Sequence, residues 1–169
     1  MPKWYTQNRV NKIVAAARKF VAGSLAGKDG VTVGKVMHRP QPGGMCARFV
    51  RQSVEGGLGL AEFAWLDPDP ANAREMAAQL KARGYSLGDT SDLKPGDILY
   101  RPSGTPGHIA IYMGTQEPGH EGVQIIAENT SSGKRGVPRR PGTKYTRRGT
   151  GEGEFGRFTE VFRLTKEVS

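Results

Sequence analysis

A single cysteine, Cys46, is the residue of this 169-residue chain best suited to covalent chemistry. It follows the glycine pair Gly43-Gly44 and opens a run whose pattern predicts a helix, so its thiol is expected in the first helical turn. A helix N-terminus favours negative charge, and the thiolate is the reactive form of cysteine. Because a lone thiol cannot form an internal disulfide, Cys46 is either a small buried hydrophobic residue or a nucleophile.

A cysteine nucleophile requires an imidazole that takes its proton and a polar group that orients the imidazole. Of the three histidines, His108 is the predicted base because it opens an apolar run directly after the glycine- and proline-containing segment 102–107. That position would place its ring at the rim of a sheet. His38, in a loop near Cys46, and His120, in a predicted hairpin turn, are weaker candidates for the same role.

The orienting group is expected at the end of the neighbouring predicted strand, which closes with Glu128, Asn129 and Thr130. Side chains alternate between the two faces of a strand, so either Glu128 or Asn129 could accept the second ring N–H of His108, but hardly both. Asn129 is preferred on strand parity, with Glu128 as the alternative. On this basis Asn129→Ala would lower turnover more than Glu128→Ala. The competing interpretation is an ordinary strand end, where Asn and Thr form turns.

An oxyanion formed during acyl transfer needs hydrogen-bond donors aimed at it. The backbone N–H of Cys46, at the start of the predicted helix, is the natural donor. Gln41, five residues earlier, is a weaker candidate that could add a side-chain amide.

Length and charge restrict the class of protein. A chain of this size predicts one domain, here residues 1–169, with a core that needs no disulfide or structural metal. No apolar run is long enough to cross a membrane, and the N-terminus lacks the apolar segment of a secretory signal, which would be consistent with delivery by a phage particle or a secretion system. The net charge of +9 predicts attraction to polyanions.

The basic excess is concentrated between Lys134 and Arg148, a stretch without acidic residues. Tyr145 is its only aromatic residue, so the stacking ladder of a single-strand binder is missing and no nucleic-acid partner is expected. The simplest interpretation is a solvated basic loop. It could also assist adsorption to an anionic polymer.

Hydrophobic periodicity predicts helices first and strands afterwards. The expected helices run from about Asn8 to Ala22, from Cys46 to the pair Gly56-Gly57, and from an Asp cap at residues 67–70 to Gly84, with a short extended piece at 31–33 in the loop 28–40. The expected strands cover residues 97–101, 108–113, 123–129 and 157–164. This order favours an α+β fold in which the helices pack on one antiparallel sheet.

The order of these motifs resembles a known family. A helix is followed by Gly-Gly-x-Cys opening a second helix, then by Leu93-Lys94-Pro95-Gly96-Asp97 and by Gly107-His108-Ile109-Ala110-Ile111-Tyr112. Over about residues 10–133 this arrangement is similar to the NlpC-type cell-wall peptidases and the related CHAP amidohydrolase/peptidase domains, which belong to the papain-like superfamily.

The resemblance implies a cysteine peptidase or amidase that cleaves peptidoglycan through an acyl-enzyme, without a cofactor or metal and with the anionic cell wall as its partner. Cys46 matches the nucleophile, His108 the base and Asn129 the asparagine of CHAP domains. Met45 and Ala47 depart from the Asp and Ser that flank the cysteine in NlpC-type enzymes. Ala127 stands two residues before Asn129, where NlpC-type domains commonly have a second histidine and CHAP domains an acidic residue. A monomer is assumed.

Two functions are alternatives to a cysteine hydrolase. The chain could be a non-catalytic module on the same fold that binds the cell wall or another polyanion through the basic stretch. A metalloenzyme using Cys46, His108 and His120 is disfavoured, because the sequence has no close-spaced pair of ligands of the kind zinc sites usually show.

Overall fold

The computed structural model describes residues 7–41, 43–88, 92–104, 107–130, 142–147 and 158–164, and it has the α+β fold expected from the sequence. The described helices are α1 (Gln7–Leu25), α2 (Cys46–Leu58) and α3 (Ala73–Ala82). The described strands are β1 (Val31–Val33), β2 (Val36–His38), β3 (Ser86–Gly88), β4 (Ile98–Arg101), β5 (His108–Gly114), β6 (Ile125–Asn129), β7 (Thr143–Arg147) and β8 (Glu160–Phe162).

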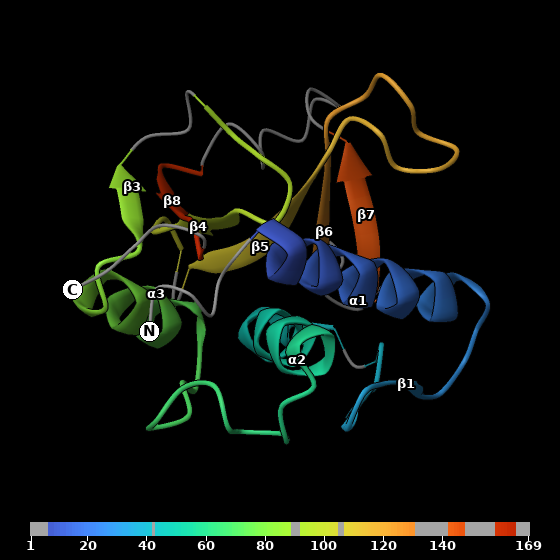
Figure 1. The fold of residues 1–169 in the computed structure, drawn as a ribbon, viewed down its shortest axis with the longest axis horizontal. Coiled ribbons are helices and arrows are strands. Elements are labelled where there is room, and N and C mark those ends of the chain that lie inside the picture. The colour runs from blue at the N-terminus through green and yellow to red at the C-terminus, as the bar shows by residue number, and fades with distance from the viewer. Residues whose placement is uncertain are drawn as a thin grey trace.

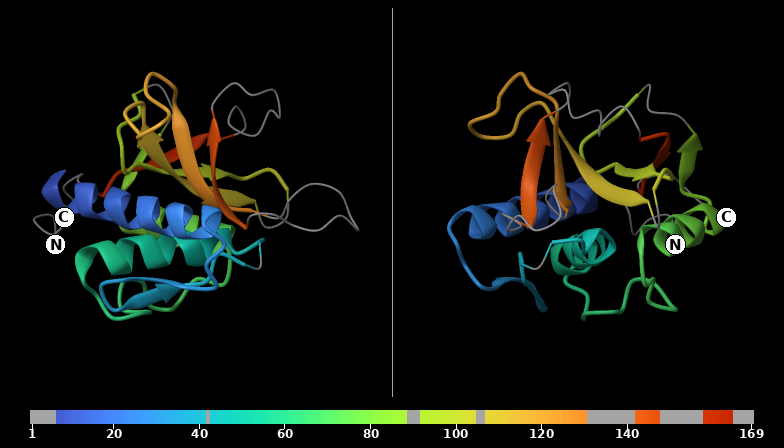
Figure 2. Two further views of the ribbon diagram at one scale, coloured as in Figure 1. Left: turned by 90° about the vertical axis from the view of Figure 1, so that its right-hand side faces the viewer. Right: turned by 180° about the vertical axis from the view of Figure 1, so that it is seen from behind.

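The main sheet is antiparallel, with the strand order β3-β8-β4-β5-β6-β7, and β1 and β2 form a separate hairpin. Helices α1 and α2 lie against each other on one side of the sheet (Figures 1 and 2). Ile109 and Ile111 of β5 share the main core with Phe20 of α1 and Phe49 of α2. A smaller apolar cluster covers the opposite face of the sheet, around Tyr112.

Two predicted helix ends were wrong for one physical reason. Helix α1 continues through Gly23 to Leu25, and α2 continues through Gly56-Gly57 to Leu58. A Cβ on Gly23 would lie 2.1 Å from Val31 Cγ2, and one on Gly57 would lie 2.6 Å from the carbonyl oxygen of Lys12. These glycines therefore permit close packing inside the fold instead of ending helices. The end of α2 is set by Gly59, whose φ is +73°.

The predicted cap of the third helix was also wrong. Helix α3 begins after Asn72, whose side chain accepts a hydrogen bond from the backbone N–H of Glu75. The aspartates at positions 67 and 69 lie in the connection that precedes it. Asn72 is thus the N-cap, and it satisfies one of the free N–H groups of the first turn.

The predicted strands are present as β4, β5, β6 and β8, and the extended piece at 31–33 is β1. Strand β2 and both edge strands of the main sheet, β3 and β7, were not predicted. Residues 143–147 of the basic stretch, expected to be a loop, pair with β6 from Asn129↔Thr143 to Ile125↔Arg147. Of the remaining stretch, only Gly142 is described, and residues 134–141 and 148 lie outside the described residues.

A β-bulge sets the register between β5 and β6. Ile111 faces Ala127 and Tyr112 faces Ile126, whereas Gly114 faces Ile125, so β5 contains one extra residue. Beyond the bulge, toward the start of β5, His108 therefore lies on the same face of the sheet as Glu128.

None of the helices in the described part of the chain is both long and apolar enough to span a membrane.

Candidate active site

Cys46 is the first residue of α2, and Met45 is the N-cap residue without a side-chain cap. Free N–H groups at a helix start bind negative charge. The backbone N–H groups of Ala47 and Ile109 donate hydrogen bonds to the Cys46 sulfur. The helix and the first residues of β5 thus surround the sulfur with donors that stabilise a thiolate.

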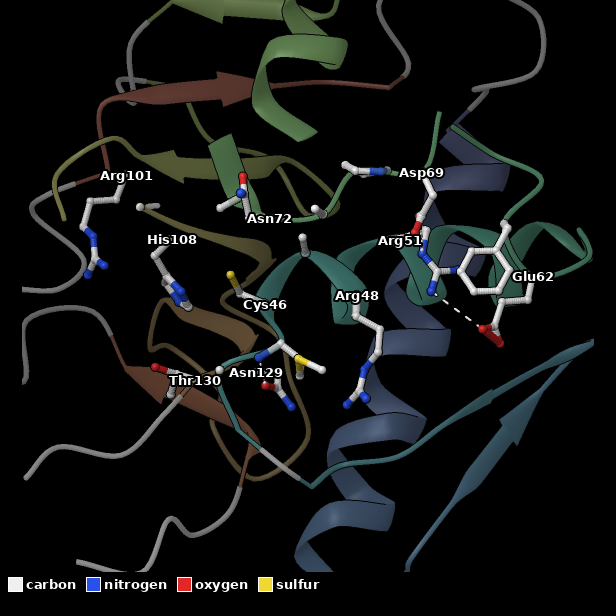
Figure 3. A pocket seen from close by; sticks show the side chains of 18 residues that line it. Cys46, Arg48, Arg51, Glu62, Asp69, Asn72, Arg101, His108, Asn129 and Thr130 are labelled. Atoms are coloured by element: carbon white, nitrogen blue, oxygen red, sulfur yellow. Dashed lines mark hydrogen bonds and ion pairs between the residues drawn. The ribbon is translucent and has the colours of Figure 1, made fainter. Parts of the chain in front are cut away.

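His108 lies between Cys46 and Glu128. Its Nε2–H donates to Glu128 Oε1 at 2.5 Å, and its ring also hydrogen-bonds the Cys46 side chain, which leaves Nδ1 as the nitrogen that faces the sulfur. Glu128 Oε2 accepts a hydrogen bond from the hydroxyl of Thr146 on β7. Figure 3 shows the Cys46 sulfur beside the His108 ring at one wall of a pocket. Cysteine, imidazole and carboxylate therefore form one connected series.

A glycine places His108 at this position. Gly107, immediately before β5, has a φ of +89°, and a Cβ there would lie 2.5 Å from the carbonyl oxygen of Arg101. Arg101 pairs with His108 across β4 and β5. Glycine is therefore required for the chain to enter β5 next to the end of β4.

The electrostatics of the series favour the charged pair. Burial alone raises the pKa of the Cys46 thiol, but its contact with His108 and the two backbone N–H groups lower that pKa below its ordinary value. Burial alone lowers the pKa of His108, but Cys46 and Glu128 raise it to about 9. For Glu128 the opposing effects of burial and of His108 leave the carboxyl pKa lowered. All three shifts favour the form in which a thiolate, an imidazolium and a carboxylate lie side by side.

Asn129 does not orient His108, so the preference for Asn129 over Glu128 was wrong. The Asn129 side chain lies on the opposite face of β6, where its Oδ1 accepts the backbone N–H of Met45 at 2.8 Å. Its Nδ2 donates to the carbonyl oxygen of Pro40 and to the hydroxyl of Thr143. Asn129 therefore holds the segment that leads to the cysteine.

The pocket beside Cys46 has a volume of about 520 Å³ and carries both charges (Figure 3). Arg48 and Arg101 contribute cationic groups to its wall, and Glu62 and Asp69 contribute acidic ones. Phe63 also lines it and is 54% exposed. A cavity of this size with mixed lining suits a polar, peptide-sized group next to the thiol.

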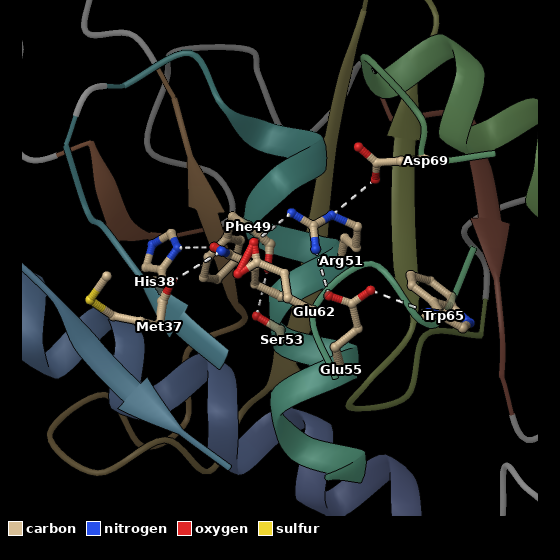
Figure 4. Close-up of polar contacts among 10 residues, drawn as sticks. Met37, His38, Phe49, Arg51, Ser53, Glu55, Glu62, Trp65 and Asp69 are labelled. Carbon is tan, nitrogen blue, oxygen red and sulfur yellow. Dashed lines mark hydrogen bonds and ion pairs between the residues drawn. The ribbon is translucent and has the colours of Figure 1, made fainter. Parts of the chain in front are cut away.

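The far wall of the pocket is held by Arg51, a buried residue of α2 (Figure 4). Its guanidinium lies 2.5 Å from Glu55, 3.2 Å from Asp69 and 3.7 Å from Glu62, and 4.2 Å from the centroid of the Phe63 ring. The buried pair of Arg51 and Glu55 would be costly to leave unpaired, and the more exposed Glu62 and Asp69 connect it to the segment between α2 and α3. Arg51 was not predicted as a residue of the site, and its Arg-x-x-x-Glu spacing to Glu55 on a helix was the available signal.

The other predicted candidates lie away from the reacting groups. His38 is fully buried and hydrogen-bonds Gln52 and Thr143. His120 lies in the connection between β5 and β6, against the ring of Tyr145. Gln41 is exposed and does not line the pocket.

Within the part of the chain that the structure describes, no three His, Cys, Asp or Glu side chains are grouped so as to hold a metal ion. Cys46, His108 and His120 thus do not form the site of the metalloenzyme alternative.

Comparisons of the chain with protein-family models, with curated proteins and with solved structures found no match.

Proposed function

We propose that the protein is a cysteine hydrolase of the papain-like type that cleaves amide bonds in bacterial peptidoglycan. The observation that carries the proposal is the series Cys46–His108–Glu128 at the wall of an open pocket. The substrate class is supported by the resemblance to NlpC-type and CHAP domains, by the net charge of +9 and by the mixed charges of the pocket.

The geometry supports an acyl-enzyme route. The Cys46 thiolate attacks the amide carbonyl carbon, and a C–S bond forms as the carbonyl oxygen becomes an oxyanion beside the start of α2. His108 then gives its proton to the amide nitrogen, the C–N bond breaks, and the amine leaves. A water molecule next gives a proton to neutral His108 and attacks the thioester carbon. The carboxylic acid is released, and the thiolate–imidazolium pair is restored.

Purified peptidoglycan provides the direct test. Incubation with the protein is expected to release soluble fragments carrying a new amine and a new carboxylate, and mass spectrometry of these fragments identifies the cleaved bond. The Cys46→Ala protein is the control and should release none. If the wild type sediments with peptidoglycan yet releases no fragment, the function is that of a binding module.

The pH dependence of kcat/KM should be bell-shaped. Activity should be lost on the acid side as the Cys46 thiolate takes a proton, at a pH below the ordinary thiol pKa because that pKa is lowered. It should be lost on the alkaline side as His108 gives up its proton, with a midpoint near the His108 pKa of about 9. Initial rates at subsaturating substrate from pH 4 to 10.5 measure both limbs. A profile still rising at pH 10 would contradict the assigned imidazolium.

A further inference from the structure

A continuous series of buried hydrogen bonds runs beneath the loop that leads to Cys46. It joins Gln52, His38, Thr143 and Asn129, in that order, and ends at the backbone N–H of Met45. We call these four side chains the relay. All four are at least 97% buried, and they come from α2, β2, β7 and β6. None of them is in the series formed by Cys46, His108 and Glu128.

The direction of each hydrogen bond in the relay is determined. Gln52 Nε2 donates to the carbonyl oxygen of Met37, so Gln52 Oε1 faces His38 and accepts its Nδ1–H at 2.8 Å. Burial lowers the pKa of His38 to about 4, so its ring is neutral and its Nε2 is an acceptor. The Thr143 hydroxyl lies 2.6 Å from that Nε2 and is its donor.

The second half of the relay continues in the same direction. The Thr143 oxygen accepts Asn129 Nδ2–H at 3.0 Å, and the second Nδ2 hydrogen goes to the carbonyl oxygen of Pro40. Asn129 Oδ1 is then the acceptor for Met45 N–H at 2.8 Å. Every side chain of the relay has a single orientation, because turning one amide would place donor against donor.

The relay ends one residue before the nucleophile. Met45 is the N-cap of α2 and has no capping side chain, so Asn129 supplies from another element an acceptor for the N-cap residue's N–H. The Pro40 carbonyl fixes the other end of the same loop. Gly142 allows β7 to approach this loop, since a Cβ there would lie 2.1 Å from the Pro40 oxygen. The relay therefore constrains both ends of the segment that aims the thiol.

We propose that His38 and Thr143 are positioning residues for Cys46, which act through Asn129 on the Met45–Cys46 peptide and so hold the thiolate against His108. The effect on turnover rests on the proposed hydrolase function. The effect on the thiolate itself does not, because alkylation of Cys46 requires no substrate.

Thr143→Val tests the relay with little change of volume, since it removes the hydroxyl that joins His38 to Asn129. The rate of Cys46 alkylation by iodoacetamide is measured against pH. We expect the apparent thiol pKa to rise by about one unit, or the rate at pH 6 to fall about tenfold, as the thiolate loses its fixed contact with His108. Thr143→Ser keeps the hydroxyl and should restore the rate to within about threefold of the wild type.

Ser53→Ala is the matched control for the loss of a buried hydroxyl. Ser53 is fully buried in α2, where its hydroxyl donates to the carbonyl oxygen of Phe49, outside the relay (Figure 4). It should lower the melting temperature by an amount similar to Thr143→Val and leave the alkylation profile unchanged. Equal alkylation profiles for Thr143→Val, Ser53→Ala and the wild type would overturn the proposal.

Hydrolysis gives the second measurement. Thr143→Val should lower kcat about 10- to 100-fold with KM changed less than about threefold, because a small displacement of the nucleophile affects the chemical step more than binding. If Thr143→Val alters the alkylation profile while the wild type itself hydrolyses no peptidoglycan, the relay is supported and the proposed function is rejected. If Thr143→Val does not fold, His38→Gln breaks the same connection, and an unchanged alkylation profile in that variant would equally overturn the proposal.

Discussion

Cys46→Ser is expected to lower kcat/KM for peptidoglycan cleavage by about 10³-fold or more. Serine keeps the position and the hydrogen-bonding capacity, but its hydroxyl does not ionise near neutral pH. The surroundings of Cys46 favour a thiolate beside an imidazolium, a charge-separated pair that a serine hydroxyl does not form. The release of soluble fragments under initial-rate conditions measures the loss.

Ser53→Ala is the control for a substitution in the same helix, and it should keep its activity because Ser53 lies outside the pocket. Circular dichroism and the melting temperature should show that Cys46→Ser folds as the wild type does. Cleavage at an undiminished rate by Cys46→Ser would show that the thiol is not the nucleophile. The proposed mechanism would then be wrong even if the protein acts on the cell wall.

Glu128→Gln is expected to lower kcat by up to about 10⁴-fold, the loss that follows when a triad carboxylate is replaced by its amide. The amide keeps the shape of the side chain but removes the negative charge that stabilises the His108 imidazolium. Because Glu128 helps to raise the His108 pKa to about 9, the alkaline limb of the pH profile should move to lower pH. Measuring kcat from pH 6 to 10.5 tests both effects.

Glu117→Gln is the matched control for the loss of a buried carboxylate. Glu117 is 1% exposed and pairs with Arg18 at 2.7 Å, away from the pocket. It should reduce stability and leave the pH profile in place. The Glu128 change should also exceed that of Asn129→Ala, the reverse of the order expected from strand parity alone. A larger loss with Asn129→Ala, together with an unmoved alkaline limb in Glu128→Gln, would mean that Glu128 does not tune His108.

Much of the fold followed from local patterns. Apolar periodicity located the helices α1, α2 and α3 and the strand β8, because burial of one face imposes a repeat that is visible in the sequence. The strands β4, β5 and β6 were located by short continuous apolar runs, because they are buried on both faces. Helix ends at glycine were misjudged, because a glycine that ends a helix and one that permits close packing look alike. Gly23 and Gly57 are of the second kind, and only their contacts with Val31 and Lys12 reveal it.

The edge strand β7 escaped prediction for a different reason. Its residues, Thr143 to Arg147, are polar or basic apart from Tyr145, and only Thr143 is fully buried, so they carry no apolar repeat. They form a strand because β6 offers its free edge to them. Thr143 and Thr146 of this strand then bind Asn129 and Glu128. The unpredicted strand therefore supports both the carboxylate beside His108 and the asparagine that holds the loop before Cys46.

The sequence alone was enough to place the two central groups of the candidate site on their secondary-structure elements. A lone cysteine at a helix start and a histidine opening a strand after glycine can be recognised from residue types and spacing, because both depend on local structure. The partner of His108 was decided only by the tertiary structure. One extra residue in β5 before Gly114 shifts the register, and strand faces alternate, so Glu128 shares the face of His108 while Asn129 turns to the helices. Without that bulge, the register of the Gly114–Ile125 pair would continue along both strands, and Asn129 would share the face of His108.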